Sequence, residues 1–180
     1  MEPTSVKKST CEKYFLRFND PSCIWAEIVI DDDGTFNAQS DNGDFQYIWR
    51  NHGRKSFKHF ILELARDSHY FLKKVSECSY FDADATEKLW KSKVIEYRKD
   101  YTLSKERARE LWDNIVDLFS GICDKTYIEI KVYESDMFEG IEEPWYDFEL
   151  INDYPHGAKH FANVIMPEFA KIIKTEIDTQ

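Results

Sequence analysis

The spacing of apolar residues changes near residue 50, and this change constrains the fold more than any other feature of the chain. Up to Trp49, apolar and polar residues alternate in short runs, which is typical of half-buried strands. The runs are separated by turns such as 31–34 and 41–44, whose Asp, Asn and Gly residues suit tight hairpins. A four-stranded antiparallel sheet is therefore predicted. Its strands are expected at residues 13–18, 23–30, 35–40 and 45–49.

After this region the apolar residues recur with the 3.6-residue period of amphipathic helices. The expected helices cover residues 57–64, 71–75, 84–101, 104–119 and 156–177, the last of them kinked or restarted at Pro167. Residues 127–133 alternate again, so an additional strand is expected there, with a short helix as the alternative. The predicted fold is α+β: an N-terminal four-stranded antiparallel meander, then a helical bundle, the additional strand and a C-terminal helix.

We expect a single α+β domain over residues 11–180, preceded by a flexible N-terminus at residues 1–10. The chain has 180 residues, an ordinary size for one domain, and no Gly/Ser-rich or Pro-rich run that would act as a linker. Thirteen Phe, ten Tyr and five Trp supply enough apolar surface for a core.

Acidic residues are segregated along the chain. Residues 18–49 and 132–158 together contain fifteen Asp and Glu and no Lys or Arg, whereas the remainder carries a net charge of +5. Such a pattern indicates a surface that meets a cationic partner. The second stretch also contains aromatic residues, and interspersed carboxylates and aromatics suit a protein that imitates the charge of a nucleic acid. The alternative is a solvated loop whose aromatic side chains fold back onto the core.

The candidate partner-binding residues come from these two stretches. They are Asp31, Asp32, Asp33, Asp41, Asp44, Glu139, Glu142, Glu143, Trp145, Tyr146, Asp147 and Glu149.

Sequence motifs for cofactor binding and catalysis are absent. The chain has no phosphate loop, dinucleotide loop or nucleophile elbow, and its four cysteines form no C-x-x-C pair. We expect no cofactor and no catalytic residues.

The net charge of −10 argues against direct nucleic-acid binding, despite a short basic run at 50–59. No signal-like segment or apolar run of about 18 residues is present, so a cytoplasmic protein that does not enter membranes is expected.

Two alternatives remain open. His156 and His160 are spaced i, i+4 and could ligate a metal together, with Asp153 near in sequence, which would make the protein a metal-dependent hydrolase acting on nucleic acid or nucleotide. The protein could also be a structural or regulatory component that self-assembles. The sequence leaves its oligomeric state open.

Several short runs in the middle of the chain resemble small proteins of unknown function encoded by bacteriophages and prophages. These runs are Tyr70-Phe71-Leu72-Lys73-Lys74-Val75-Ser76, Phe81-Asp82 with Thr86, and Ala108-Arg109-Glu110-Leu111-Trp112-Asp113. The resemblance extends from the strands to the last helix. It implies an accessory protein made in the cytoplasm of a bacterial host, and it carries over no active site.

The sequence therefore favours a non-enzymatic protein that binds a host protein with a basic surface. It would inhibit or modulate that protein by charge mimicry. A nucleic-acid-binding component of antiviral defence, such as a CRISPR effector, is one candidate partner.

Overall fold

A computed structural model describes residues 4–121 and 124–179 of the chain. These residues form two compact units, which we describe separately. Unit 1 contains the N-terminal part of the chain up to Cys78 and the C-terminal part from Tyr154 onward, and unit 2 is Ser79–Asp153. The expectation of a single domain stays a prediction. Residues 1–3 of the expected flexible N-terminus lie outside the described residues, and Thr4–Thr10 form no helix or strand.

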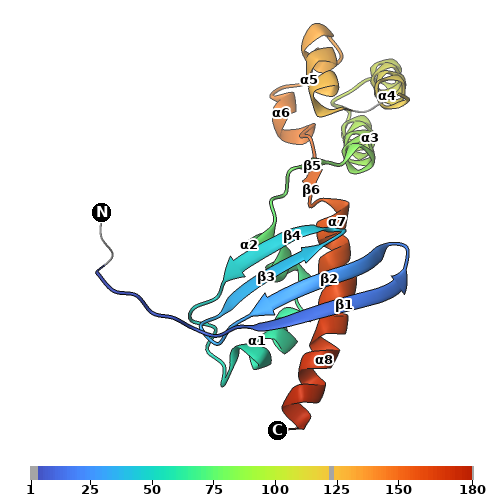
Figure 1. The fold of residues 1–180 in the computed structure, drawn as a ribbon. Coiled ribbons are helices and arrows are strands. Elements are labelled where there is room, and N and C mark those ends of the chain that lie inside the picture. The colour runs from blue at the N-terminus through green and yellow to red at the C-terminus, as the bar shows by residue number, and fades with distance from the viewer. Residues whose placement is uncertain (1–3, 122–123, 180) are drawn as a thin grey trace. The chain divides into compact units, whose positions relative to one another are not determined.

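Unit 1 contains the predicted four-stranded antiparallel meander, in the order β1-β2-β3-β4 (Figure 1). The strands are β1 (Glu12–Asp20), β2 (Cys23–Ile30), β3 (Thr35–Ser40) and β4 (Gly43–Ile48). Gly34 ends the turn between β2 and β3 with φ +90°, and a Cβ at this position would lie only 2.3 Å from the carbonyl oxygen of Trp49. Glycine is needed here for both reasons.

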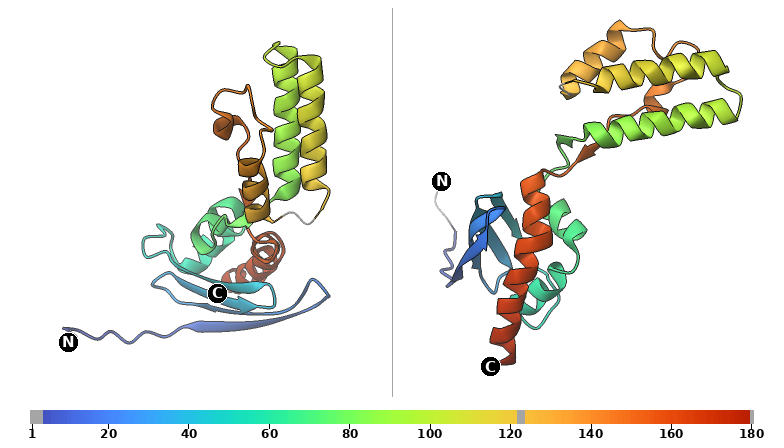
Figure 2. Two further views of the ribbon diagram at one scale, coloured as in Figure 1. Left: turned by 90° about the horizontal axis from the view of Figure 1, so that it is seen from above. Right: turned by 90° about the vertical axis from the view of Figure 1, so that its right-hand side faces the viewer.

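The helices of unit 1 lie on one side of the sheet in both views of Figure 2. They are α1 (Phe57–Leu64), α2 (Ser68–Val75), α7 (His156–His160) and α8 (Met166–Asp178), with a π-helical segment, η1 (Phe161–Ile165), joining the last two. Alternate residues of the strands face these helices, and Ile28, Phe36 and Phe45 are buried in the shared core. The core is rich in aromatic contacts. The Phe36 ring, for example, meets Phe71 and Phe161 edge to face.

The C-terminal helix continues through Pro167, as expected, by changing its hydrogen-bonding pattern. Proline cannot donate a backbone hydrogen bond, and the π-helical segment η1 lies immediately before α8, which has this proline in its first turn.

Unit 2 is mainly helical. Its elements are β5 (Tyr80–Phe81), α3 (Ala83–Lys99), α4 (Lys105–Phe119), α5 (Lys125–Glu134), α6 (Pro144–Asp147) and β6 (Asn152–Asp153). The helices α3 and α4 pack against each other, and β5 pairs with β6 so that the two ends of the unit meet. Trp90, Leu111, Ile115 and Ile128 form a second core within this unit.

The predicted α+β class is confirmed, but the strand expected at residues 127–133 is wrong, because this segment is the helix α5. Asp124 caps the helix by accepting a hydrogen bond from the backbone N–H of Tyr127. Ile128 and Val132, four residues apart, pack into the core, whereas Ile130 is half exposed. The alternation therefore does not correspond to two faces of a strand. The helix α3 begins slightly before the expected residue 84, because Asp82 caps it by accepting a hydrogen bond from the backbone N–H of Ala85.

Candidate functional site

The acidic residues of the first stretch do not form one patch. Asp31, Asp32 and Asp33 lie in the turn between β2 and β3, whereas Asp41 and Asp44 lie at the turn between β3 and β4. Successive turns of an antiparallel meander lie at opposite ends of the sheet. The two groups are therefore separated by the length of β3.

Several of these carboxylates stabilise the turns themselves. Asp31 Oδ1 accepts a hydrogen bond from the backbone N–H of Thr35 at 2.9 Å, and Asp41 Oδ2 accepts one from the N–H of Ile24 at 2.7 Å. The bond from Ile24 holds the pKa of Asp41 below its usual range. Asp33 pairs with Lys7 at 2.8 Å, which lowers the pKa of Asp33. Asp32 and Asp44 are exposed.

The second acidic stretch lies almost entirely in unit 2, where it runs from the end of α5 through α6 to β6. We call residues 134–149 the acidic segment. Glu139, Glu142, Glu143 and Glu149 are exposed, and no ion pair within the described part of the chain neutralises these four carboxylates. Glu143 adopts a left-handed conformation (φ 48°) just before Pro144 starts α6.

Two large aromatic side chains project from α6 into solvent. Trp145 is 72% exposed and Tyr146 is 78% exposed. By contrast, Phe148 is buried and Phe138 half-buried, and both pack on Trp90 in the core of unit 2. The solvated-loop alternative thus holds for Phe138 and Phe148 but not for Trp145 and Tyr146.

Asp147 differs from Glu139, Glu142, Glu143 and Glu149 because its carboxylate is already paired within unit 2. Its carboxylate accepts a hydrogen bond from the Tyr97 hydroxyl at 2.6 Å and forms an ion pair with Lys93 at 3.0 Å. These two contacts lower the pKa of Asp147, and the hydrogen bond to Asp147 together with burial raises the pKa of Tyr97 to about 12. Asp147 therefore connects α6 to α3, and Lys93 compensates the negative charge of its carboxylate.

Arg107 fixes the first part of the acidic segment to α4. Its Nη2 lies 3.1–3.2 Å from the backbone carbonyl oxygens of Asp136, Met137 and Glu139, to which it donates, and its Nη1 donates to Glu110. A planar guanidinium suits such converging acceptors. The segment is therefore held at both ends, by Arg107 near its start and by Asp147 near its end.

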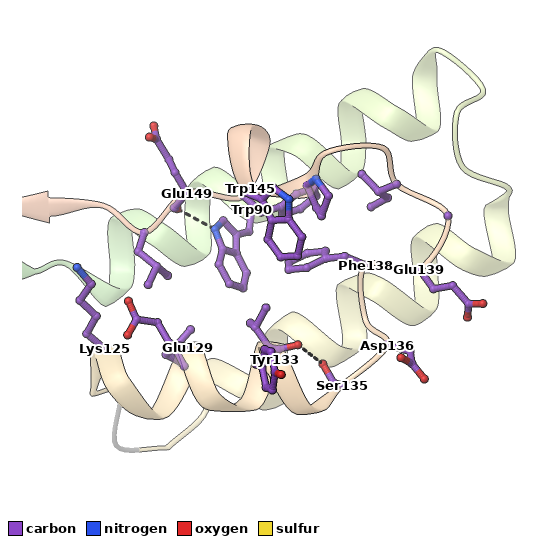
Figure 3. A pocket seen from close by; sticks show the side chains of 17 residues that line it. Trp90, Lys125, Glu129, Tyr133, Ser135, Asp136, Phe138, Glu139, Trp145 and Glu149 are labelled. Atoms are coloured by element: carbon purple, nitrogen blue, oxygen red, sulfur yellow. Dashed lines mark hydrogen bonds between the residues drawn. The ribbon is translucent and has the colours of Figure 1, made fainter.

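A cavity of about 910 Å³ opens between α5 and the acidic segment. Figure 3 shows Trp145 and Phe138 on one wall and Tyr133 on the other. Lys125 and Glu129 lie at one end, and Asp136 and Glu139 at the other. The Trp90 indole forms part of the inner surface and donates a hydrogen bond to the Glu149 carbonyl oxygen at 3.0 Å. Three of the sequence-predicted residues, Glu139, Trp145 and Glu149, line this cavity.

Other lining residues were missed from the sequence as functional candidates. Trp90 fits the buried stripe of a helix, and Tyr133 falls within the segment expected to be a strand. A helical prediction for residues 127–133 would have placed Ile128 and Val132 on one face, toward the cavity.

The negative charge belongs mainly to unit 2. This unit contains 19 Asp and Glu against 10 Lys and Arg, whereas unit 1 contains 15 against 14. Unit 2 therefore has a formal net charge of −9.

The histidine pair that suggested a metal site lies in α7 of unit 1. His160 Nε2 lies 3.3 Å from the hydroxyl oxygen of Ser22, which in turn donates to Asp20 at 2.6 Å. Within residues 4–121 and 124–179, no three His, Cys, Asp or Glu side chains are grouped so that they could hold a metal ion. Over the same residues, no helix has both the length and the apolar character required to cross a membrane.

The model of a protein family described as a phage family matches residues 4–175. The match covers both units and nearly the whole chain, and the chain belongs to this phage family. No curated protein and no solved structure matches it.

Proposed function

We propose that this phage protein binds a host protein that has a basic, nucleic-acid-binding surface, and that it inhibits or modulates that protein by charge mimicry. The observation that carries the proposal is the acidic segment of unit 2. There, exposed and unneutralised carboxylates stand beside the exposed aromatic rings of Trp145 and Tyr146.

The electrostatics favour a cationic partner. A unit with a formal net charge of −9 attracts basic proteins and repels nucleic acids, and this attraction accelerates association at low salt. Carboxylates at the rim of an interface mainly determine the rate of encounter and its salt dependence. Exposed Trp and Tyr are the residue types that most often supply binding energy once two proteins are in contact.

Membership of a phage family supports a partner from the bacterial host. Proteins that hold nucleic acid in a groove lined by Lys and Arg have the surface that an acidic mimic would fit. A component of antiviral defence, such as a CRISPR effector, is a candidate of this class. The proposal rests on unit 2 and does not require the hairpin-tip acids Asp31, Asp32, Asp33, Asp41 and Asp44.

The test compares two variants with equal charge changes. E142Q/E143Q removes two exposed carboxylates from the acidic segment, and D84N/D117N removes two exposed carboxylates from α3 and α4 of the same unit. Each protein is immobilised and used to capture proteins from a bacterial host lysate at low and high salt. We expect the wild type and D84N/D117N to recover the same basic nucleic-acid-binding protein, displaceable by added duplex DNA. Recovery by E142Q/E143Q should be about tenfold lower at low salt.

Equal recovery by the two variants would contradict the proposal, provided that circular dichroism shows both to be folded. Capture that does not respond to salt or to competing DNA would contradict it as well.

A further inference from the structure

The cavity of unit 2 combines an apolar interior with an acidic rim. Its interior is formed by side chains of the second core, including Trp90, Ile128, Phe138 and Phe148. The acidic rim consists of Glu129, Asp136, Glu139 and Glu149, with a single cation, Lys125, among the lining residues. In Figure 3 the carboxylates of Asp136, Glu139 and Glu149 point outward from the interior of the cavity. A smaller cavity in the same unit, of about 490 Å³ beside Arg107 and Asp117, has a more polar lining.

The cavity has the size and exposure of a binding site. Its volume of about 910 Å³ lies near the upper end of the ~300–1,000 Å³ typical of ligand sites. Trp145 and Tyr133 flank its mouth and are 72% and 92% exposed, so two large aromatic faces border an apolar interior. An occupant that covered these rings would bury apolar surface that now faces water, which stabilises a complex by roughly 25 cal/mol per Å².

The rim selects the chemistry of the occupant. Four carboxylates against one ammonium disfavour phosphate groups, free fatty acids and other anions, because like charges at a partly desolvated site are costly to bring together. A second copy of the chain would bring a net charge of −10 toward the same rim. The favoured occupant has apolar side chains for the interior and several positive charges for the rim.

We infer that this groove binds a Lys/Arg-rich amphipathic segment of the partner protein. Its aliphatic or aromatic side chains enter the cavity between α5 and the acidic segment, and its cations pair with the rim carboxylates. The inference rests on the proposed function and extends it, since charge mimicry alone requires no apolar anchor. A helix with anchors at i, i+3, i+4 and i+7 is the usual way in which proteins present such a segment to a groove.

Three labelled peptides serve as probes, with binding followed by fluorescence anisotropy. The first is a helical peptide with Leu at i, i+3, i+4 and i+7 and Lys elsewhere. The second is an oligolysine of equal charge, and the third has the same Leu positions with Gln in place of Lys. We expect the wild-type protein to bind the Leu/Lys peptide at least about tenfold more tightly than the oligolysine, a difference equivalent to about 1.4 kcal/mol.

Matched variants localise the site. W145A and Y133A each remove an exposed ring that lines the groove, and both should reduce the preference for Leu/Lys over oligolysine to less than about threefold. Y146A removes the neighbouring exposed ring, which does not line the groove, and should keep the full preference. E142Q/E143Q should weaken binding of both charged peptides equally and leave the preference unchanged.

The outcomes separate the groove from the general acidic attraction. Equal binding of Leu/Lys and oligolysine to the wild type, or the same preference in W145A, Y133A and Y146A, would overturn the groove and leave the proposed function standing. If the Leu/Gln peptide binds as tightly as Leu/Lys and E142Q/E143Q affects neither, the charge-based function itself fails. Self-association of the wild type that the Leu/Lys peptide reverses would assign the groove to a second copy and overturn the inference.

Discussion

Lys58 binds two carboxylates that come from opposite ends of the chain. Its Nζ lies 2.7 Å from Glu12 of β1 and 2.8 Å from Glu176 of α8, and the Tyr14 hydroxyl oxygen lies within hydrogen-bond distance of both acids, at 2.6 Å from Glu12 and 2.9 Å from Glu176. Burial by itself would lower the pKa of Lys58, but the hydrogen bonds to Glu12 and Glu176 outweigh it and raise the pKa. Because the side chain is only 15% exposed, these contacts are less screened than those of a surface ion pair. The cluster therefore joins the first strand, α1 and the last helix of unit 1.

Replacing Lys58 by Met keeps the aliphatic stem and removes the charge. We expect K58M to lower the free energy of unfolding by about 1–2 kcal/mol, because Glu12 and Glu176 lose their cation while remaining partly exposed. The control is K171M, which breaks an exposed i, i+3 pair with Glu168 in the same unit and should cost less than about 0.5 kcal/mol. Urea unfolding at pH 7 measures both values, and equal losses would contradict a structural role for the cluster.

The contribution of Lys58 should depend on pH in a direction set by Glu12. Hydrogen bonds from Lys58 and then Tyr14 lower the pKa of Glu12 in the folded state, so the unfolded state binds its proton first as the pH falls. The stabilisation is therefore complete above the ordinary Glu pKa of about 4.3 and is lost as the pH falls through the lower folded value. The stability difference between wild type and K58M should shrink below about pH 4. A constant difference would contradict this assignment.

At the level of elements, the sequence predicted most of the fold because its local signals agree with its tertiary contacts. The alternating runs and the turns at 31–34 and 41–44 coincide with the four strands of the meander, and the helical spacing of residues 104–119 coincides with α4, which Ser104 caps. The strand predicted at residues 127–133 is wrong because the local sequence pattern and the tertiary contacts disagree there. Ile128, Ile130 and Val132 alternate as in a strand, but the Asp124 cap and burial of Ile128 against the second core outweigh the β propensity.

The candidate site was only partly predictable for a similar reason. Composition identifies the acidic stretch, but it cannot distinguish Asp147, which is held by Tyr97 and Lys93, from Glu142, which is exposed. That difference depends on contacts between residues about 50 positions apart. The cavity also depends on such contacts, because its walls come from α3, α5 and the acidic segment.

Arg107 should determine how well the acidic segment is ordered. Lys at this position keeps the charge but cannot direct a planar fork toward three carbonyl oxygens, so R107K should loosen residues 136–141. We expect amide hydrogen exchange in this loop to become about tenfold faster, measured by mass spectrometry. R109K, on the same helix with an exposed i, i+4 partner, is the control and should leave the loop unchanged. Equal exchange in both variants would contradict the role given to Arg107.

For the whole molecule, the division into two units changes the meaning of the net charge. The chain is not uniformly acidic: unit 1 is nearly neutral, and unit 2 carries a formal charge of −9. Unit 1 also contains both ends of the described chain. Unit 2 is inserted into unit 1 between α2 and α7. The acidic segment and its cavity therefore lie in an insertion that has its own core.

Separate cores predict separate unfolding. Ile173 belongs to the core of unit 1 and Ile115 to that of unit 2, and both side chains are fully buried. Ile→Ala at a buried site costs about 2–5 kcal/mol, enough to lower the melting temperature of a unit of this size by about 10 °C or more. We expect calorimetry of the intact protein to show two transitions, with I173A lowering one and I115A the other. A single transition that both variants shift equally would instead support one cooperative domain over residues 11–180, because loss of either core would then unfold the whole chain.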